Sequence, residues 1–218
     1  MKLEKINGFV FDMDGLMFDT ERLVYEIWKK MMDERGLPYD SDDFKQTVGK
    51  RKLEVQNFYF GKYGADFPYW ELSQTCRERY IEYISSEGIP VKKGLNEILD
   101  VIKGFGGKIA MATSTSRYTA ELNIKVGGVA EYFDVLVCGD DVKNGKPHPE
   151  VFLTAANKLG FEPQECAAFE DSINGIKSAH AAGMTTFMVP DLIQPTEEII
   201  TMIDFLCKDL SEAADILR

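Results

Sequence analysis

The fold of this chain is decided by the stretch Phe9-Val-Phe-Asp12-Met-Asp14-Gly15-Leu-Met-Phe-Asp19-Thr20-Glu21. Residues 8–11 are apolar, with β-branched and aromatic side chains in the middle, which predicts a short strand buried on both faces. Asp12 and Asp14 follow on the same side of the extended chain, because side chains repeat every two residues. Gly15 then lets the backbone turn.

Two carboxylates at the end of a buried parallel strand repel each other unless a cation, a proton or a ligand compensates their charge. The carboxyl end of a strand is also where open α/β sheets bind ligands. An Asp-x-Asp pair can equally be a simple turn after a strand, since Asp40-Ser-Asp42 has the same spacing in a polar segment. The buried strand before Asp12, and three later segments, favour a functional site.

Composition and charge limit the classes of function. A chain of 218 residues can build one sizeable core, or a core plus a small accessory domain. The net charge of -11 argues against nucleic-acid and anionic membrane partners, although it leaves an anionic small molecule open as a substrate. The four cysteines form no C-x-x-C pair, and no apolar stretch approaches the length of a membrane span, so we expect a cytoplasmic protein.

The hydrophobic pattern changes along the chain. Residues 21–35 have helical spacing, and residues 39–87 are aromatic and charged, with helical patterns and no convincing strand. Later, strands at 108–112, 135–138, 166–169 and 185–189 alternate with helices at 95–104, 118–126, 150–159 and 173–182. This alternation predicts the α/β class, with a doubly wound parallel sheet formed by residues 1–16 and 90–218. Residues 17–89 are predicted to be a small helical-bundle domain inserted into this core.

The later strands also end in polar residues. The strand at 108–112 runs into Thr113-Ser114-Thr115-Ser116, which suits an anion at a helix N-terminus but is also typical of a simple helix cap. Lys146 stands between a glycine and a proline, either as a stiffly held charge or as an exposed loop lysine. Glu170-Asp171-Ser172 could complete an all-oxygen Mg²⁺ site with the first carboxylate pair, or could merely cap the next helix.

The order of these segments resembles the haloacid dehalogenase (HAD) superfamily of phosphotransferases. The resemblance covers essentially the whole chain, which is most similar to the phosphatase and phosphomutase branch with a cap after the first motif. The stretches that carry it are Asp12-Met-Asp14-Gly15-Leu-Met-Phe-Asp19-Thr20-Glu21, Gly145-Lys146-Pro147 and Glu170-Asp171-Ser172. It implies a Rossmann-like core and a phosphoric monoester hydrolase.

The resemblance also implies roles for single residues. Asp12 would be the nucleophile that forms an aspartyl-phosphate, and Asp14 the general acid and then the general base. Ser114, helped by the backbone of Thr115, would bind the phosphoryl oxygens, and Lys146 would neutralise charge there.

The same resemblance implies a magnesium cofactor. Mg²⁺ would be held by Asp12, the main-chain oxygen of Asp14, Asp171 and Glu170. Oxygen ligands of this kind are those that Mg²⁺ prefers in proteins.

The resemblance implies that residues 17–89 are a helical cap domain that moves on hinges at 18–20 and 88–91, and substrate choice is expected to depend on this cap. The basic run Lys50-Arg51-Lys52 could meet the distal part of a substrate, or could be a solvated helix start, and Thr20 is a further candidate. In the sugar phosphomutases of this branch a histidine lies twelve residues after the nucleophile, where this chain has Val24. Residues 12–23, 48–50, 181–184 and 188–191 are similar to the pseudouridine-5'-phosphatase group, which favours phosphatase activity.

These observations predict a Mg²⁺-dependent phosphatase of a small phosphorylated metabolite, either a sugar phosphate or a nucleoside monophosphate. The alternatives are a β-phosphoglucomutase-like sugar phosphomutase and a non-catalytic sensor of phosphometabolites. The expected partner is a small phosphate ester, with no nucleic acid and no membrane, and the protein is expected to be a monomer or weak dimer.

Overall fold

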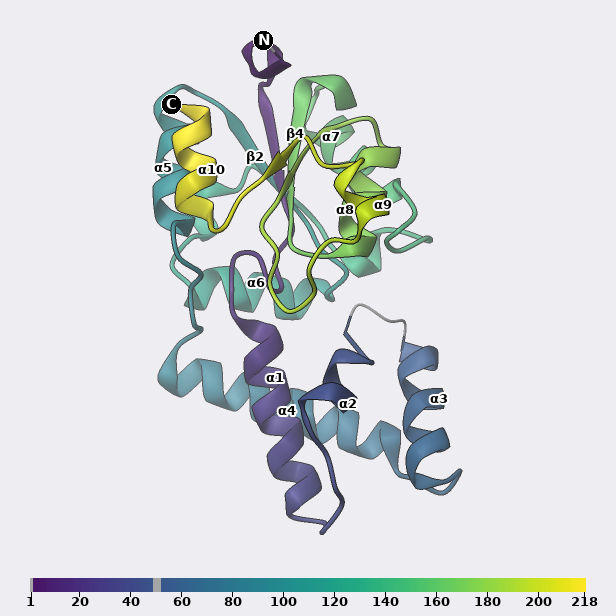
Figure 1. Cartoon of the computed structure of the whole chain (residues 1–218). Coiled ribbons are helices and arrows are strands. Elements are labelled where there is room, and N and C mark those ends of the chain that lie inside the picture. The colour runs from purple at the N-terminus through teal and green to yellow at the C-terminus, as the bar shows by residue number, and fades with distance from the viewer. Residues whose placement is uncertain (1, 49–51) are drawn as a thin grey trace. The chain divides into compact units, whose positions relative to one another are not determined.

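The structure, a computed structural model, describes residues 2–48 and 52–218 (Figure 1). In chain order its elements are η1 (Lys2–Lys5), β1 (Gly8–Phe11), α1 (Thr20–Asp33), α2 (Ser41–Lys45), α3 (Lys52–Tyr63), α4 (Tyr69–Glu87), α5 (Leu95–Gly104), β2 (Lys108–Ala112), α6 (Arg117–Val126), η2 (Ala130–Tyr132), β3 (Val135–Val137), η3 (Gly139–Asp141), α7 (Glu150–Leu159), η4 (Pro163–Glu165), β4 (Cys166–Glu170), α8 (Ile173–Ala181), β5 (Thr185–Met188), α9 (Glu197–Ile200), β6 (Phe205–Leu206) and α10 (Leu210–Leu217). None of the helices in these described residues is long and apolar enough to cross a membrane.

The strands form one parallel sheet in the order β3-β2-β1-β4-β5-β6. The chain builds outward from β1 through β2 to β3, and then returns to the other side of β1 with β4. Such a reversal leaves a crevice at the carboxyl ends of the two strands where it occurs, here β1 and β4. The expected fold class, a doubly wound parallel α/β sheet, is confirmed.

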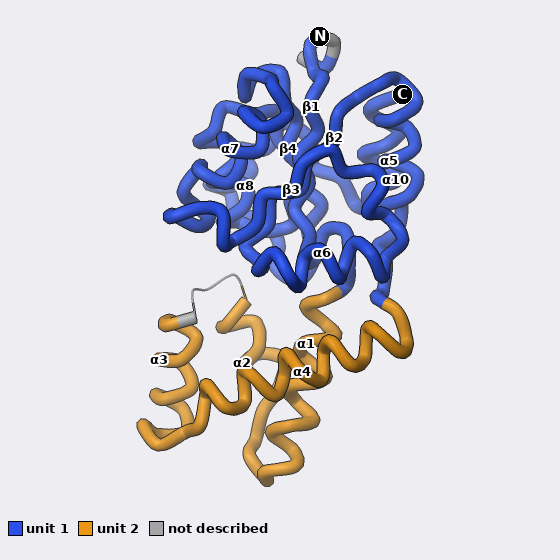
Figure 2. Tube along the Cα trace, turned by 180° about the vertical axis from the view of Figure 1, so that it is seen from behind, with its two compact units in different colours: residues 1–19, 89–218 blue, residues 20–88 orange. Residues whose placement is uncertain are grey.

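The two faces of the sheet differ in the size of their side chains. Val10, Ala110 and Ala168 form a cluster with Phe152 of α7, and small side chains let that helix approach closely. On the other face, Phe9 contacts Phe105 at the end of α5 with ring centroids 5.5 Å apart. Helices α5 and α10 pack against each other and lie side by side in Figures 1 and 2.

A ladder of phenylalanines crosses four neighbouring strands. The ring of Phe169 in β4 lies 4.4 Å from that of Phe11 in β1 and 4.7 Å from that of Phe187 in β5. Phe187 in turn lies 4.5 Å from Phe205 in β6. Residues at matching register positions on parallel strands stack in this way, so the ladder ties the strands that carry the site to the edge of the sheet.

The chain divides into two compact units, residues 1–19 with 89–218, and residues 20–88 (Figure 2). The smaller unit contains α1 to α4. The first unit extends to residue 19, three residues beyond the predicted boundary, because Met17 and Phe18 are completely buried in it and Phe18 pairs with Val91. The second boundary lies one residue before the predicted one.

The smaller unit is held together by aromatic packing. Tyr59 is its centre, with ring centroids 5.1 Å from Trp28, 5.4 Å from Phe67 and 5.5 Å from Tyr69. The hydroxyl groups of Tyr59 and Tyr39 lie 3.0 Å apart in a hydrogen bond. Large rings bury much apolar area each, which suits a unit too small for a deep aliphatic core.

We expect the Phe169→Ala substitution to lower the free energy of unfolding by about 3–5 kcal/mol, since it leaves a cavity between two stacked rings. Urea or guanidinium unfolding measures this as a lower midpoint with an unchanged slope. The control is Phe105→Ala, at a half-exposed ring, which should cost clearly less. Equal losses for the two variants would contradict the role of the ladder.

Candidate active site

The carboxylates predicted from the sequence meet at the reversal of strand order. Asp12 directly follows β1, its N–H donates to the Phe169 carbonyl oxygen of β4 at 3.0 Å, and only 7% of the residue is exposed. Glu170 ends β4 and is completely buried, and Asp171 follows it. Asp12, Glu170 and Asp171 each offer a carboxylate oxygen, all within 4.8 Å of one another.

Lys146 neutralises part of this charge. Its Nζ donates to Asp12 Oδ1 at 2.5 Å, to Glu170 Oε1 at 2.5 Å and to the Ala112 carbonyl oxygen at 3.0 Å. The ammonium also lies 5.1 Å from the centre of the Phe152 ring, a favourable cation–π distance. The lysine is therefore not an exposed loop residue but a buried cation.

For both Asp12 and Lys146, burial and the charge of the other residue shift the pKa in opposite directions. Burial raises the pKa of Asp12 well above its ordinary value; the Lys146 ammonium opposes that shift, and the carboxylates of Glu170 and Asp14 reinforce it. Burial alone would lower the pKa of Lys146, but Asp12 and Glu170 outweigh it and raise that pKa. The lysine thus keeps its proton, and a further cation beside Asp12 would favour the ionised carboxylate.

Two glycines leave room for the carboxylates. Gly15 has φ +81°, a conformation that favours glycine, and a Cβ there would overlap Asp171 Oδ2. A Cβ on Gly175, in α8, would overlap the carboxyl group of Glu170. Glu170 is fixed further by Ser172, whose hydroxyl donates to Glu170 Oε2 at 3.0 Å and accepts from the Gly175 N–H at 3.0 Å.

Asp14 is held by hydroxyl groups from the loop after β2. Thr115 Oγ1 donates to Asp14 Oδ2 at 2.6 Å, and Thr113 Oγ1 lies 3.5 Å from the same oxygen. Thr113 is buried, whereas Ser114, the residue singled out from the sequence, is exposed. The reason is that the Thr113 N–H still donates to the Val137 carbonyl oxygen, so strand pairing continues beyond β2 and brings Thr113 to the sheet edge.

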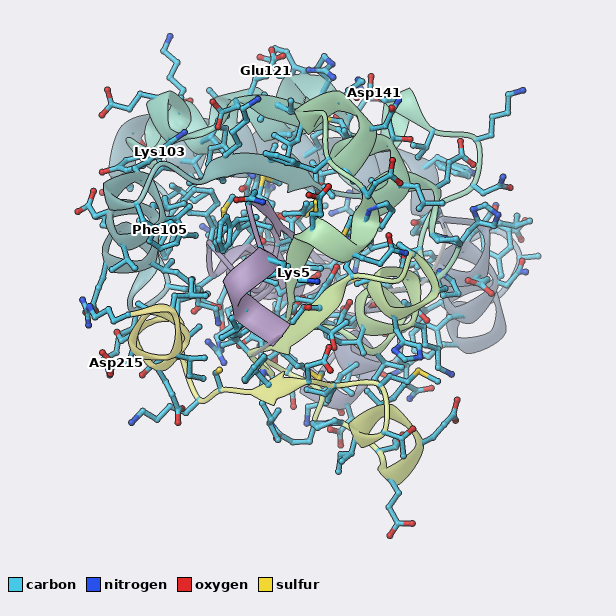
Figure 3. The ribbon with its side chains drawn as sticks, turned by 90° about the horizontal axis from the view of Figure 1, so that it is seen from above. Lys5, Lys103, Phe105, Glu121, Asp141 and Asp215 are labelled. Carbon is cyan, nitrogen blue, oxygen red and sulfur yellow. The ribbon has the colours of Figure 1, made fainter. Side chains whose placement is uncertain are left out.

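The same loop is braced from β3. Gly139 N–H donates to the Thr115 carbonyl oxygen at 2.9 Å. Arg117, the first residue of α6, donates its N–H to Asp140 Oδ2 at 2.9 Å and its guanidinium to Asp141 Oδ2 at 2.6 Å. Arg117 also pairs with Glu121, and Figure 3 shows Glu121 and Asp141 along one margin of the core.

The donor set fits a hard divalent cation. Its atoms are all carboxylate oxygens, they converge within 4.8 Å, and the single ammonium of Lys146 cannot neutralise three carboxylates. The Asp14 side chain does not belong to this group. The expected contribution of its main-chain oxygen stays a prediction.

The residues expected to select the substrate belong to the smaller unit or lie outside the described residues. Thr20 is the buried first residue of α1, in the smaller unit. Lys50 and Arg51 lie outside the described residues, and Lys52 begins α3. Their role therefore stays a prediction.

The fold and the site define an α/β enzyme with a lysine-bridged carboxylate centre at the reversal of its sheet. Residues 9–189 match the family profile of haloacid dehalogenase-like hydrolases, and the chain belongs to this family. The family expected from the sequence is confirmed.

Relatives and solved structures agree with this membership. A Thermotoga maritima protein named phosphorylated carbohydrates phosphatase is 32% identical over 179 residues, 82% of each chain. A Drosophila melanogaster protein named probable pseudouridine-5'-phosphatase is 32% identical over 197 residues, 87% of this chain and 84% of its own. The structure of CbbY from Rhodobacter sphaeroides in complex with phosphate is 25% identical, with a TM-score of 0.80 over 95% of this chain and 96% of that one. The expected class, a phosphoric monoester hydrolase, agrees with the names of both relatives.

The Gly175→Ala substitution should destabilise the protein by about 1–3 kcal/mol, because the new methyl group would displace the buried Glu170 carboxylate and its lysine partner. Gly104→Ala is the matched control, since that helix position in α5 has open space around it and should become slightly more stable. Thermal or chemical unfolding of both variants tests this, and unchanged stability of Gly175→Ala would contradict the packing described above.

Proposed function

We propose that this protein is a Mg²⁺-dependent phosphatase that hydrolyses a small phosphorylated metabolite through an aspartyl-phosphate. The observation that carries the proposal is the buried Lys146 ammonium between Asp12 and Glu170, beside a third carboxylate. A buried nucleophile with an ammonium at 2.5 Å suits a substrate that is itself an anion, because positive charge must offset the repulsion between the two.

The first half of the reaction joins the phosphoryl group to Asp12. A carboxylate oxygen of Asp12 attacks the phosphorus atom, and the bond from phosphorus to the ester oxygen breaks. Asp14 donates a proton to the departing oxygen, so the alcohol leaves neutral. We assign Lys146 and the hydroxyl of Thr113 to the phosphoryl oxygens, and Ser114 remains a further candidate.

The second half releases phosphate. Asp14, now ionised, takes a proton from a water molecule, which attacks phosphorus and breaks its bond to Asp12. The hydrogen bond from Thr115 keeps the Asp14 carboxylate oriented while its charge changes. A divalent cation held by Asp12, Glu170 and Asp171 would supply further positive charge against the repulsion between the substrate and these carboxylates.

Two substrate classes are consistent with the relatives. One relative is named for phosphorylated carbohydrates and the other for pseudouridine-5'-phosphate, so both a sugar phosphate and a nucleoside monophosphate remain candidates. Val24 stands where the sugar phosphomutases carry a histidine, which favours water rather than a second sugar as the acceptor. We further propose a cytoplasmic location, consistent with four free, buried cysteines.

A phosphate-release assay over a panel of sugar phosphates and nucleoside monophosphates tests the function. We expect turnover in the presence of Mg²⁺. Asp12→Asn should lower the turnover rate about 10⁴-fold or more, because it removes the nucleophile while keeping a side chain of similar shape. Activity that survives this substitution would overturn the mechanism. Formation of glucose 6-phosphate from β-glucose 1-phosphate with a bisphosphate primer would instead support the mutase.

Metal binding can be tested without turnover. Mg²⁺ should raise the midpoint of thermal unfolding of the wild-type protein, by an amount that grows with the logarithm of the free Mg²⁺ concentration above the dissociation constant. Asp171→Asn should reduce this shift, since it removes one of the three carboxylates. An equal shift for Asp171→Asn and the wild type would exclude Asp171 as a metal ligand. Asp140→Asn, at an exposed carboxylate outside the cluster, is the control and should keep the wild-type shift.

A further inference from the structure

The two chain segments that join the units form a short antiparallel ribbon. Asp19 N–H donates to the Pro90 carbonyl oxygen at 2.9 Å, and Lys92 N–H donates to the Met17 carbonyl oxygen at 2.9 Å. Between these bonds, Phe18 forms an antiparallel bridge with Val91. All six residues belong to the larger unit, so the ribbon is a part of the catalytic core.

The ribbon is continuous with the loop that carries Asp14. Phe18 also forms a parallel bridge with Asp14, and the Gly15 N–H donates to the Phe18 carbonyl oxygen at 3.0 Å. The ring of Phe18 is completely buried and occupies the space beside Gly127, where a Cβ would overlap it. A displacement of the Phe18 backbone would therefore move the Asp14 loop.

Lys92 ties this ribbon to the sheet. Its Nζ donates to Asp191 Oδ1 at 2.7 Å and lies 3.5 Å from Asp19 Oδ1. Only 4% of the Asp191 side chain is exposed, so this ion pair is shielded on one side. Asp191 follows β5 just after Val189, whose N–H donates to the Glu170 carbonyl oxygen at 2.8 Å.

We propose that Lys92 is a positioning residue for Asp14. Through its ion pair with Asp191, Lys92 holds residues 90–92 beside the end of β4, which carries Glu170. Through its own N–H and its contact with Asp19, it fixes residues 17–19. The ribbon then sets where the Asp14 loop stands relative to Asp12. This inference rests on the proposed function, in which Asp14 protonates the leaving group.

Leaving-group chemistry separates positioning from general stability. Benzyl phosphate releases an alcohol, which needs a proton as it departs, whereas p-nitrophenyl phosphate releases a stable phenolate, which does not. The two esters have similar size. Because kcat/KM reports the steps up to the first irreversible one, here the loss of the leaving group, it is sensitive to the proton donor only for benzyl phosphate.

The experiment measures kcat/KM of Lys92→Met with both esters. A misplaced proton donor should lower the value for benzyl phosphate about 10-fold while changing that for p-nitrophenyl phosphate less than about 2-fold. The matched control is Lys93→Met, which breaks a neighbouring ion pair of the same length, 2.7 Å to Asp209, at an exposed lysine and should leave both values unchanged. Equal losses on the two esters, or no loss, would overturn the inference.

Asp14→Asn distinguishes this inference from the proposed function. If Asp14→Asn lowers kcat/KM equally for the two esters, the proposed role of Asp14 fails. If Asp14→Asn lowers it more for benzyl phosphate and Lys92→Met does not, only the positioning role of Lys92 fails. Lys92→Met leaves the buried Asp191 carboxylate without its ammonium, which can prevent folding. The neutral double variant Lys92→Met/Asp191→Asn removes that problem and should also lower kcat/KM for benzyl phosphate more than for p-nitrophenyl phosphate. A ratio of the two kcat/KM values equal to that of the wild type would refute the inference.

Discussion

The structure of the site depends on one buried ammonium group. Lys146 Nζ binds the Ala112 carbonyl oxygen at the end of β2, Asp12 after β1 and Glu170 at the end of β4. Three neighbouring strands thus end on the same cation. Without it, the buried carboxylates of Asp12 and Glu170 would face each other with no cation between them, and like charges are costly where little water reaches them. The reversal of strand order forms the crevice, and the lysine offsets the repulsion between the carboxylates that lie in it.

The acids are nevertheless in excess, and this excess gives the site its chemistry. A centre that was neutral without ligands would have little reason to bind either a metal ion or a phosphate. In the proposed mechanism the surplus negative charge would attract a divalent cation, and the cation and the lysine together would attract the anionic ester. Glycines at positions 15 and 175 keep this arrangement compact, because any side chain there would occupy the space of a carboxylate.

Much of this could be predicted from the sequence, because strand ends in a parallel sheet converge. Asp12 and Glu170 stand at the ends of short apolar runs, so the alternation of strands and helices predicted that they would meet at one edge of the sheet. Lys146 stands in a polar loop, where the residues alone left it open as a site residue or an exposed lysine, and its burial became clear only from its contacts with Asp12 and Glu170. The bounds of β2 agree with the sequence pattern, but the pattern does not show that pairing with β3 continues one residue beyond Ala112. It therefore pointed to Ser114, which is exposed, whereas the pairing brings the buried Thr113 to the sheet edge. The last strand, Phe205–Leu206, has two residues and no periodicity, and it becomes recognisable only when Phe205 stacks on Phe187.

The pairing of the two linker segments also explains how a core interrupted by a whole unit can form. Asp19 and Pro90 are hydrogen-bonded neighbours, so the ends of residues 20–88 leave and re-enter the core at one point. Closing a long loop costs only slightly more conformational entropy than closing a short one, since the cost grows with the logarithm of its length. For the core, the insert is therefore equivalent to a long loop between β1 and α5. Its sequence and length can change in evolution while the geometry around Asp12 is conserved.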